Sequence, residues 1–370
     1  MSEQDTSASS GGIGGRAVVT LGRILISIFI PFVAFVVLWG GFIFLRDTNA
    51  PQGIIASVAI IWGVGGVALL FWVADWVVNR LPLQTAKKLQ PFVFVGPALV
   101  ILGWYLFIPA LRSLYLSFFD ARSQAFVGLQ NYVFAFTDPK MLESFVNNLM
   151  WIVLGTGGAV GFGLIIALLA DRSRFEKFFK ALVFLPMAIS FVGAGVIWRF
   201  VYAYKPPMEE QIGLLNAMVT FFGGEPQAWF TMQPWNNIFL IVILVWLQTG
   251  YAMVIISAAL KGIPSSIIEA GRIDGATEMK IIIRIIIPSI FSTLVTVATT
   301  IIIISLKIFD IVFTMTNGNY GTEVIASMQY KQMFRFLHYG RGSAIAMVLV
   351  IAVIPVMWYN LRQFSKREGF

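Results

Sequence analysis

One stretch of this apolar chain gathers charged side chains of both signs, which can form ion pairs with another surface. Residues 261–288 read KGIPSSIIEAGRIDGATEMKIIIRIIIP and hold four basic and three acidic side chains. Within this stretch, residues 267–275 can form a short helix that carries Glu269, Arg272 and Asp274. Arg272 and Asp274 would project away from the glycine face of that helix, free to pair across an interface.

Two features predict how the short helix begins and what it can approach. Ser265 or Ser266 is expected to be the N-cap, and Glu269 follows Ser266 at the capping-box spacing. Gly271 and Gly275 are four apart, so both would lie on one helix face and admit a close surface. The simpler alternative is a solvated linker between two apolar segments.

Few other residues could carry catalysis or bind a metal. The 370 residues include no cysteine and a single histidine, His338, which excludes disulfides, thiolate or zinc-type sites and cysteine or His-pair catalysis. A membrane-embedded enzyme would need such groups or paired carboxylates at the interface, and none is apparent. The sequence also lacks a Gly-x-x-x-x-Gly-Lys-Ser/Thr phosphate loop, so any ATP hydrolysis must come from another polypeptide. We therefore expect a chain that is not an enzyme and binds no cofactor itself.

The composition indicates which elements position these groups. Hydrophobic residues make up 58% of the chain and charged residues only 12%, whereas soluble domains carry about 25% charged residues. So few charges could not cover a surface exposed to water, so the chain is an integral membrane protein. A spanning helix needs about 20 apolar residues. Eight segments qualify, at about 24–45, 54–78, 91–118, 144–170, 181–204, 237–260, 287–314 and 343–361. The predicted fold class is all-α, a polytopic bundle of about eight transmembrane helices.

Membrane topology explains the excess of basic residues. The chain has 26 Lys and Arg against 18 Asp and Glu. With the N-terminus placed inside, most of the basic residues fall in the inner regions, in agreement with the positive-inside rule. Both termini are therefore expected in the cytoplasm, and the charge implies no nucleic-acid partner.

The order of spans and loops divides the chain into four parts. Residues 1–23 are expected to be a disordered cytoplasmic tail, 24–90 a transmembrane hairpin, 91–361 a core of six spans and 362–370 a second cytoplasmic tail. No segment outside the spans is long enough to form an independent soluble domain.

A long, gapped pattern runs through the charged stretch. It consists of Glu269-Ala270-Gly271, then Gly275 after three residues, then Ile285-x-Ile287-Pro288 after nine more. This pattern resembles the EAA loop of binding-protein-dependent ABC importer permeases, which reads Glu-Ala-Ala, three residues, Gly, nine residues, Ile-x-Leu-Pro. Gly271 replaces the second Ala, which lowers helix propensity by about 1 kcal/mol, and Ile287 replaces Leu.

Other short sequences are similar to the carbohydrate-uptake, maltose-permease-like branch of that family. They are Phe126-Val127-Gly128-Leu129, Asn131-Tyr132, Phe309-Asp310-Ile311 and the run 316–325, which is most like α-glucoside or glucosylglycerol permeases. The resemblance covers about residues 91–361. It implies a type I ABC importer permease core of six spans, to which the hairpin 24–90 would be an accessory.

The resemblance also implies partners. Such permeases pair with a second homologous permease and two ATPase subunits, which hold ATP and Mg²⁺, and they accept solute from an extracytoplasmic sugar-binding protein. This chain would then form half of the path for an oligosaccharide or glycoside, such as an α-glucoside or glucosylglycerol, across the bacterial cytoplasmic (inner) membrane. The short helix would be the coupling helix that docks on one ATPase subunit. Its coupling residues would be Glu269, Ala270, Gly271, Arg272, Asp274 and Gly275.

Polar and aromatic side chains inside the spans are candidates for the sugar site, because polar groups there tend to face a cavity. Aligned with the family, most of the candidates fall at or next to sugar-lining positions. They are Met187, Ser190, Phe191, Trp246, Gln248, Tyr251, Ser305, Lys307 and Asp310. The alternative is a structural role: Lys307 and Asp310 could neutralise each other, and Gln248 could bond a neighbouring helix.

Two other kinds of transporter stay open. An importer of the same family could carry a non-sugar solute. A self-powered secondary transporter would need intramembrane carboxylates for ion coupling, and only Asp310 lies clearly deep in a span, with Lys307 beside it.

Overall fold

The computed structural model describes residues 13–80, 83–171 and 173–367, and these are helical apart from turns, loops and one isolated bridge between Phe119 and Phe126. The predicted all-α class is confirmed. The described residues contain six helices long and apolar enough to cross a membrane, or eight if each of two bent pairs is one span. The chain forms two compact units, residues 1–110 and 111–370, and each is described by itself.

The first unit begins with two long helices. α1 (Ile13–Asp47) and α2 (Gln52–Val78) pack against each other, and the Trp62 indole nitrogen donates to the Leu38 carbonyl at 3.1 Å. α1 starts earlier than the sequence led us to expect, because no proline interrupts it before Pro31. The rest of the expected N-terminal tail, residues 1–12, lies outside the described residues.

The third apolar helix crosses the expected boundary at residue 90. It is built from α3 (Leu83–Leu102), a π-helical turn η1 (Gly103–Phe107) and α4 (Ile108–Leu116). The first compact unit ends at Ala110, so most of this helix groups with α1 and α2.

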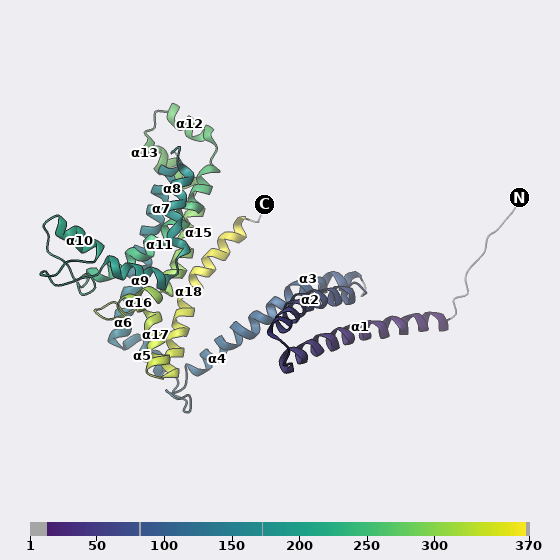
Figure 1. Ribbon diagram of the computed structural model, residues 1–370. Helices are drawn as coiled ribbons and strands as arrows, with labels where there is room; N and C mark the ends of the chain where they lie inside the picture. The colour runs from purple at the N-terminus through teal and green to yellow at the C-terminus, as the bar shows by residue number, and fades with distance from the viewer. Residues whose placement is uncertain (1–12, 81–82, 172, 368–370) are drawn as a thin grey trace. The chain divides into compact units, whose positions relative to one another are not determined.

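The second unit is organised around α11 (Trp235–Lys261; Figure 1). Most of the central residues of α11 are buried. α11 packs most extensively on α7 (Thr156–Ala170), which continues the helix of α6 (Pro139–Met150) and η2 (Trp151–Gly155). The local sequence explains where α6 begins. Asp138 is its N-cap, with Oδ1 accepting the backbone N–H groups of Lys140 and Met141, and Pro139 occupies the first turn.

Two spans expected to be straight, 181–204 and 287–314, are broken. The first consists of α8 (Glu176–Phe184), a 3₁₀ turn η3 (Leu185–Ala188) and α9 (Phe191–Val201), with a bend of 103°. Pro186 lies in the 3₁₀ turn, Ile189 is extended, and the Ser190 hydroxyl caps α9 by accepting the Gly193 N–H at 3.0 Å.

The other broken span bends by 71° at Ile290. Its first part is α13 (Glu278–Ile281), η4 (Ile282–Ile286) and α14 (Ile287–Ser289), and its second part is α15 (Phe291–Leu306). A further break at residues 307–309 precedes α16 (Asp310–Met315).

The remaining helices lie at the end of the second unit away from α12 (Ser265–Ile273), except that α10 (Leu214–Phe221) follows α9 and α18 (Tyr339–Arg367) runs along α15 (Figure 1). They are α5 (Gln130–Thr137), α17 (Ile325–Tyr330) and the π-helical turn η5 (Lys331–Arg335). α18 extends to Arg367, beyond the expected start of the C-terminal tail.

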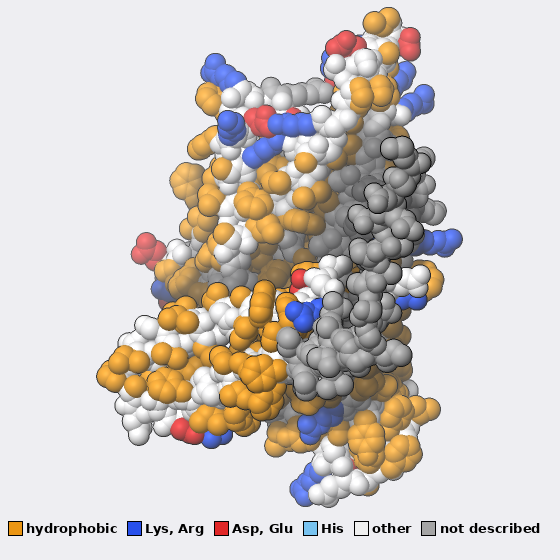
Figure 2. Space-filling model, turned by 90° about the vertical axis from the view of Figure 1, so that its right-hand side faces the viewer, with side chains coloured by type: hydrophobic (Ala, Val, Ile, Leu, Met, Phe, Trp, Pro, Cys, Tyr) orange, Lys and Arg blue, Asp and Glu red, His pale blue; other side chains and the backbone are white. Residues whose placement is uncertain are grey.

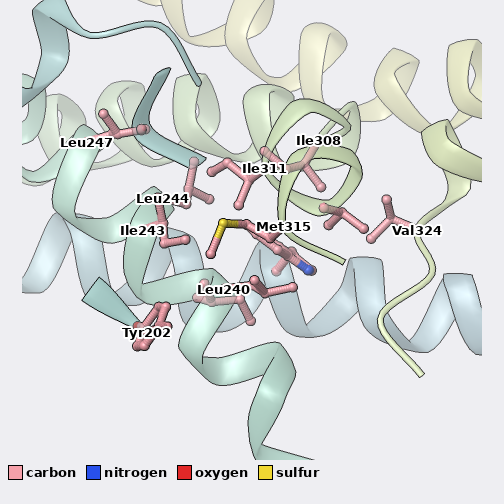
Figure 3. Packing of buried hydrophobic residues seen from close by; sticks show 13 residues of the cluster. Tyr202, Leu240, Ile243, Leu244, Leu247, Ile308, Ile311, Met315 and Val324 are labelled. Carbon is pink, nitrogen blue, oxygen red and sulfur yellow. The ribbon is translucent and has the colours of Figure 1, made fainter. Parts of the chain in front are cut away.

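The buried core holds the broken spans against α11. Figure 3 shows Leu240, Ile243 and Leu244 of α11 facing Ile311 and Met315 of α16. On the molecular surface, Figure 2 shows hydrophobic side chains over the flank and charged side chains gathered at the upper end. This is the distribution expected of a bundle whose flank contacts lipid and whose ends meet water.

Candidate functional site

A cavity of about 280 Å³ lies where the first broken span meets α11 and α15. Its walls come from η3 and α9 on one side, α11 on another and α15 on a third. The lining residues are Met187, Ile189, Phe191, Leu247, Gln248, Tyr251, Thr300 and Ile304. The structure therefore brings four of the predicted sugar-site residues together: Met187, Phe191, Gln248 and Tyr251.

Gln248 is the polar centre of this cavity. Its side chain is 5% exposed, and among the described residues its amide has no hydrogen-bond partner. The structure therefore gives no bond of the kind that the structural alternative for Gln248 requires. An amide that reaches a cavity without a bond inside the protein is free to bond a ligand or water there. With two N–H donors and a carbonyl acceptor it can bind hydroxyl groups.

The close approach of α8 to α11 fixes two of the cavity walls. A Cβ on Gly250 would lie 2.5 Å from the Val183 carbonyl oxygen, so only glycine allows this contact. Directly beyond α8, η3 delivers Met187 and Ile189 to the cavity opposite Tyr251. Phe191 and Tyr251 provide ring surface, so the site combines an apolar lining with a few hydrogen-bonding groups.

Five predicted residues lie outside this cavity, among them Trp246, Ser190 and Ser305. Trp246 lines a separate apolar cavity of about 380 Å³ and makes an edge contact with Trp198, at 5.7 Å between ring centroids. Ser190 caps α9. Ser305 is fully buried in α15, where the Asn148 amide donates to its backbone carbonyl at 3.2 Å.

Lys307 and Asp310 lie at the break between α15 and α16. Within the part of the chain that the structure describes, they form no ion pair with each other, in contrast to the structural alternative. Lys307 ends α15 with an exposed side chain, and Asp310 is half-buried at the start of α16, where a carboxylate is favoured by the helix dipole. The helix break separates the two side chains, because residues three positions apart are neighbours only in a continuous helix.

Four lining residues were missed by the sequence analysis: Ile189, Leu247, Thr300 and Ile304. Thr300 and Ile304 are four apart on α15, the spacing of one helix face, but they sit in a uniformly β-branched run that has no local signal.

The predicted short helix is present as α12, but it begins differently. Pro264 is the N-cap, and no side chain caps the first turn, so neither Ser265 nor Ser266 has the predicted role. Pro264 has an extended ψ of 130°, which places both serines inside the first turn.

Gly271 in α12 and Gly275 just after it serve the fold of the loop; they do not form a shared docking face. Gly271 is buried, and a Cβ there would lie 2.7 Å from the Ile285 side chain. Gly275 lies beyond the helix with φ +75°, and the N–H groups of Gly275 and Ala276 bond back to Arg272 and Gly271. This is a Schellman ending, which needs a left-handed residue.

The exposed face of α12 carries acidic and apolar groups. Glu269, Ala270 and Asp274 are exposed, and among the described residues neither carboxylate has a hydrogen-bond or ion-pair partner. Ile273 between them is 85% exposed. Arg272 is paired within the loop, with Nε 2.9 Å from Glu278 Oε1, and this carboxylate raises the pKa of Arg272.

Residues 159–364 match the family of binding-protein-dependent transport system inner membrane components. This match includes α11, the cavity and α12. The chain belongs to this family. It is a permease subunit of an ABC importer, and an ion-coupled secondary transporter is thereby excluded.

The permease has similar relatives of known name. It is 58% identical over 276 residues to the osmoprotective compounds uptake permease protein GgtC of Synechocystis sp., covering 75% of this chain and 99% of that protein. It is 46% identical over 332 residues to the alpha-glucoside transport system permease protein AglF of Rhizobium meliloti, covering 86% and 99%.

Solved structures support the fold of the permease. A bacterial ABC transporter that imports the acidic polysaccharide alginate matches with a TM-score of 0.63 at 21% identity, over 77% of this chain and 99% of that one. The type I importer fold is therefore confirmed, and the permease is an integral inner-membrane transport subunit. Among the described residues, no group of three or more His, Asp or Glu side chains could hold a metal ion.

Proposed function

We propose that this permease forms half of the translocation path for a small glycoside, such as an α-glucoside or glucosylglycerol. One observation carries the proposal: the buried, unpartnered amide of Gln248 faces a cavity lined by Tyr251 and Phe191. Hydroxyl groups of a sugar can bond the amide, and an aromatic ring can cover the apolar face of a sugar ring. The name of AglF, an alpha-glucoside transport permease, supports the same class of solute.

The volume of the cavity favours a small solute. At about 280 Å³ it lies at the lower end of the range for ligand pockets, which is roughly 300–1,000 Å³. A second permease would contribute the other half of the path. Lys307 and Asp310 lie outside this cavity, so they would line the path at another point, at the break between α15 and α16.

The partners follow from the α12 end of the second unit. α12 would dock on one of two ATPase subunits through Glu269, Asp274 and the exposed Ile273, while ATP and Mg²⁺ stay on those subunits. An extracytoplasmic binding protein would deliver solute from the opposite side; such a protein is bound to the alginate transporter. Both termini would then be cytoplasmic, with 24–90 as an accessory hairpin.

Uptake by the reconstituted importer tests the solute. The permease, its partner permease, the ATPase and the binding protein are placed in proteoliposomes and supplied with labelled glucosylglycerol or an α-glucoside. Replacing the amide by an apolar group of similar length in Gln248→Met should raise the solute concentration for half-maximal uptake by about tenfold, the effect of one lost buried hydrogen bond. Gln90→Met, an exposed glutamine in α3, is the matched control.

Three outcomes decide the proposal. Glycoside uptake weakened only by Gln248→Met supports it. Uptake unchanged by Gln248→Met places the solute elsewhere on the path. If a non-sugar solute competes for uptake and glycosides do not, the transported solute is not a sugar and the proposal is wrong.

A further inference from the structure

An ionic cluster joins three helices at the end of the second unit that carries α12. Glu176 of α8 pairs with Lys180 one turn later at 2.6 Å and with Lys261 at the end of α11. Lys180 also pairs with Asp171 at the end of α7, at 2.5 Å. Two carboxylates and two ammonium groups are thus balanced within one cluster.

A hydroxyl group completes the cluster. Ser257 of α11 donates to Asp171 Oδ1 at 2.7 Å and also contacts Lys180. Side-chain exposure is 16% for Asp171, 18% for Lys180 and 27% for Glu176, whereas Lys261 at the edge of the cluster is 56% exposed. Partial burial makes the two pairs of Lys180 stronger than ordinary surface pairs, and leaving the partly buried Glu176 carboxylate without its partners is costly.

Residues of the cluster begin or end the segments that form two cavity walls and the loop that carries α12. Seven residues beyond Lys180, the same segment reaches Met187 in the cavity wall, and ten residues before Lys261, α11 presents Tyr251 in the facing wall. Ten residues of helix span about 15 Å. Directly after Lys261 the chain enters the loop that carries α12. Glu176 forms ion pairs with Lys180 of the first segment and with Lys261 of the second.

We infer that Glu176 is a positioning residue that clamps α8 to α11, so that both cavity walls move as one body when α12 is displaced. The clamp is an intrasubunit contact that stays closed through the transport cycle. Without it, α8 would be joined to α11 by the Lys180–Ser257 contact and by packing near Gly250, and a push on α12 would move α11 while α8 lagged behind. The inference rests on the proposed coupling role of α12.

The first test measures a distance, which does not depend on the solute. Because the chain has no cysteine, Lys177→Cys on α8 and Gly262→Cys after α11 give a single pair of spin-label sites. In the assembled transporter, the label distance should be the same with no nucleotide and with ATP and vanadate. In the Glu176→Gln background the distribution should broaden or shift with nucleotide. A nucleotide-dependent distance with Glu176 intact would overturn the clamp.

The second test measures coupling. Glu176→Gln and Lys261→Gln should each lower solute transported per ATP hydrolysed by about fivefold, and the double variant should do no more than Glu176→Gln alone, because Glu176→Gln already removes the Glu176–Lys261 pair. Glu209→Gln, which breaks the exposed Lys205–Glu209 pair, is the matched control. A lower thermal midpoint with an unchanged transport-to-ATP ratio would reduce the cluster to a structural role and contradict the inference. If the wild-type assembly carries another solute, the proposed glycoside is wrong, while this ratio still tests the clamp.

Discussion

Two loops at opposite ends of the second unit, 316–325 and the loop that carries α12, are held by different chemistry. At one end, buried amides hold the loop 316–325: Asn147 donates to the carbonyls of Gly321 and Glu323 at 3.0 and 2.8 Å, and Asn237 also bonds Gly321. At the other end, α12 is closed by a backbone turn and one exposed Arg272–Glu278 pair.

The difference indicates which end is suited to exchange partners. If a buried side-chain amide moves away, the carbonyl groups that it bonded are left without a hydrogen bond, at a cost of about 1–3 kcal/mol each. Exposed ion pairs contribute about 0–1 kcal/mol. The amide-held end is therefore a fixed structural element, and the α12 end, with the unpartnered carboxylates of Glu269 and Asp274, has charges available to another protein.

The largest expected effect is at the α12 end. Glu269→Lys should abolish ATP-driven uptake, because it places a positive charge where a carboxylate would meet basic groups of the ATPase. Since Glu269 has no partner among the described residues, the amount and the thermal midpoint of the permease should stay unchanged. Glu210→Lys in an exposed loop makes the same charge change and should be silent. Normal coupling in Glu269→Lys would refute the role of α12.

A substitution at the amide-held end should act on stability instead. Asn147→Ala removes the donor for two buried carbonyl groups and should destabilise the permease by about 2–4 kcal/mol. Thermal unfolding in detergent measures this, with exposed Gln84→Ala as control. A shift as small as that of the control would show that water replaces the amide, and the contrast between the two ends would fail.

An intermediate effect is expected where α12 ends. Gly275→Ala forces a side chain into the left-handed region at φ +75°, at about 1–2 kcal/mol. The strain should fray the last turn of α12, so uptake should fall several-fold while the assembly persists. Gly223→Ala, at φ +81° in a loop far from α12, carries the same strain and should leave uptake intact. Equal loss from both would show that strain anywhere, and not the shape of α12, limits transport.

The smallest effect should come from the exposed pair. Arg272→Gln breaks the contact with Glu278 but should change the free energy of unfolding by less than about 0.5 kcal/mol, as exposed pairs do. Chemical denaturation of the purified permease is sensitive enough to set this bound. A loss comparable to that of Asn147→Ala would mean that both ends are equally rigid.

The sequence predicted the straight spans because long apolar runs can only be buried in lipid as helices, as in α2, α11 and α18. It did not predict the breaks in the segments 181–204 and 287–314. Pro186 and Pro288 are visible in the sequence, but proline inside a span is often accommodated as a kink, so composition alone cannot distinguish a kink from a bend of 103°.

The part of the candidate site that the sequence predicted is the part that depends only on which residues share one face of a helix. Gln248 and Tyr251 are three apart on one face of α11, and they meet in the cavity. Trp246 was predicted with them but lines a separate cavity, because it is two residues from Gln248 and lies on another face of α11. The inward direction of Gly271 depends on Ile285 across the loop, a tertiary contact that no local pattern reveals.

Affinity purification of this permease from its native membranes in mild detergent tests the central claim most directly. If the α12 end docks on the ATPase, the wild-type chain should bring with it one second permease and two ATPase subunits. Glu269→Lys should lose the ATPase and keep the second permease. A chain that purifies alone, or one whose ATPase stays bound in Glu269→Lys, would contradict the account.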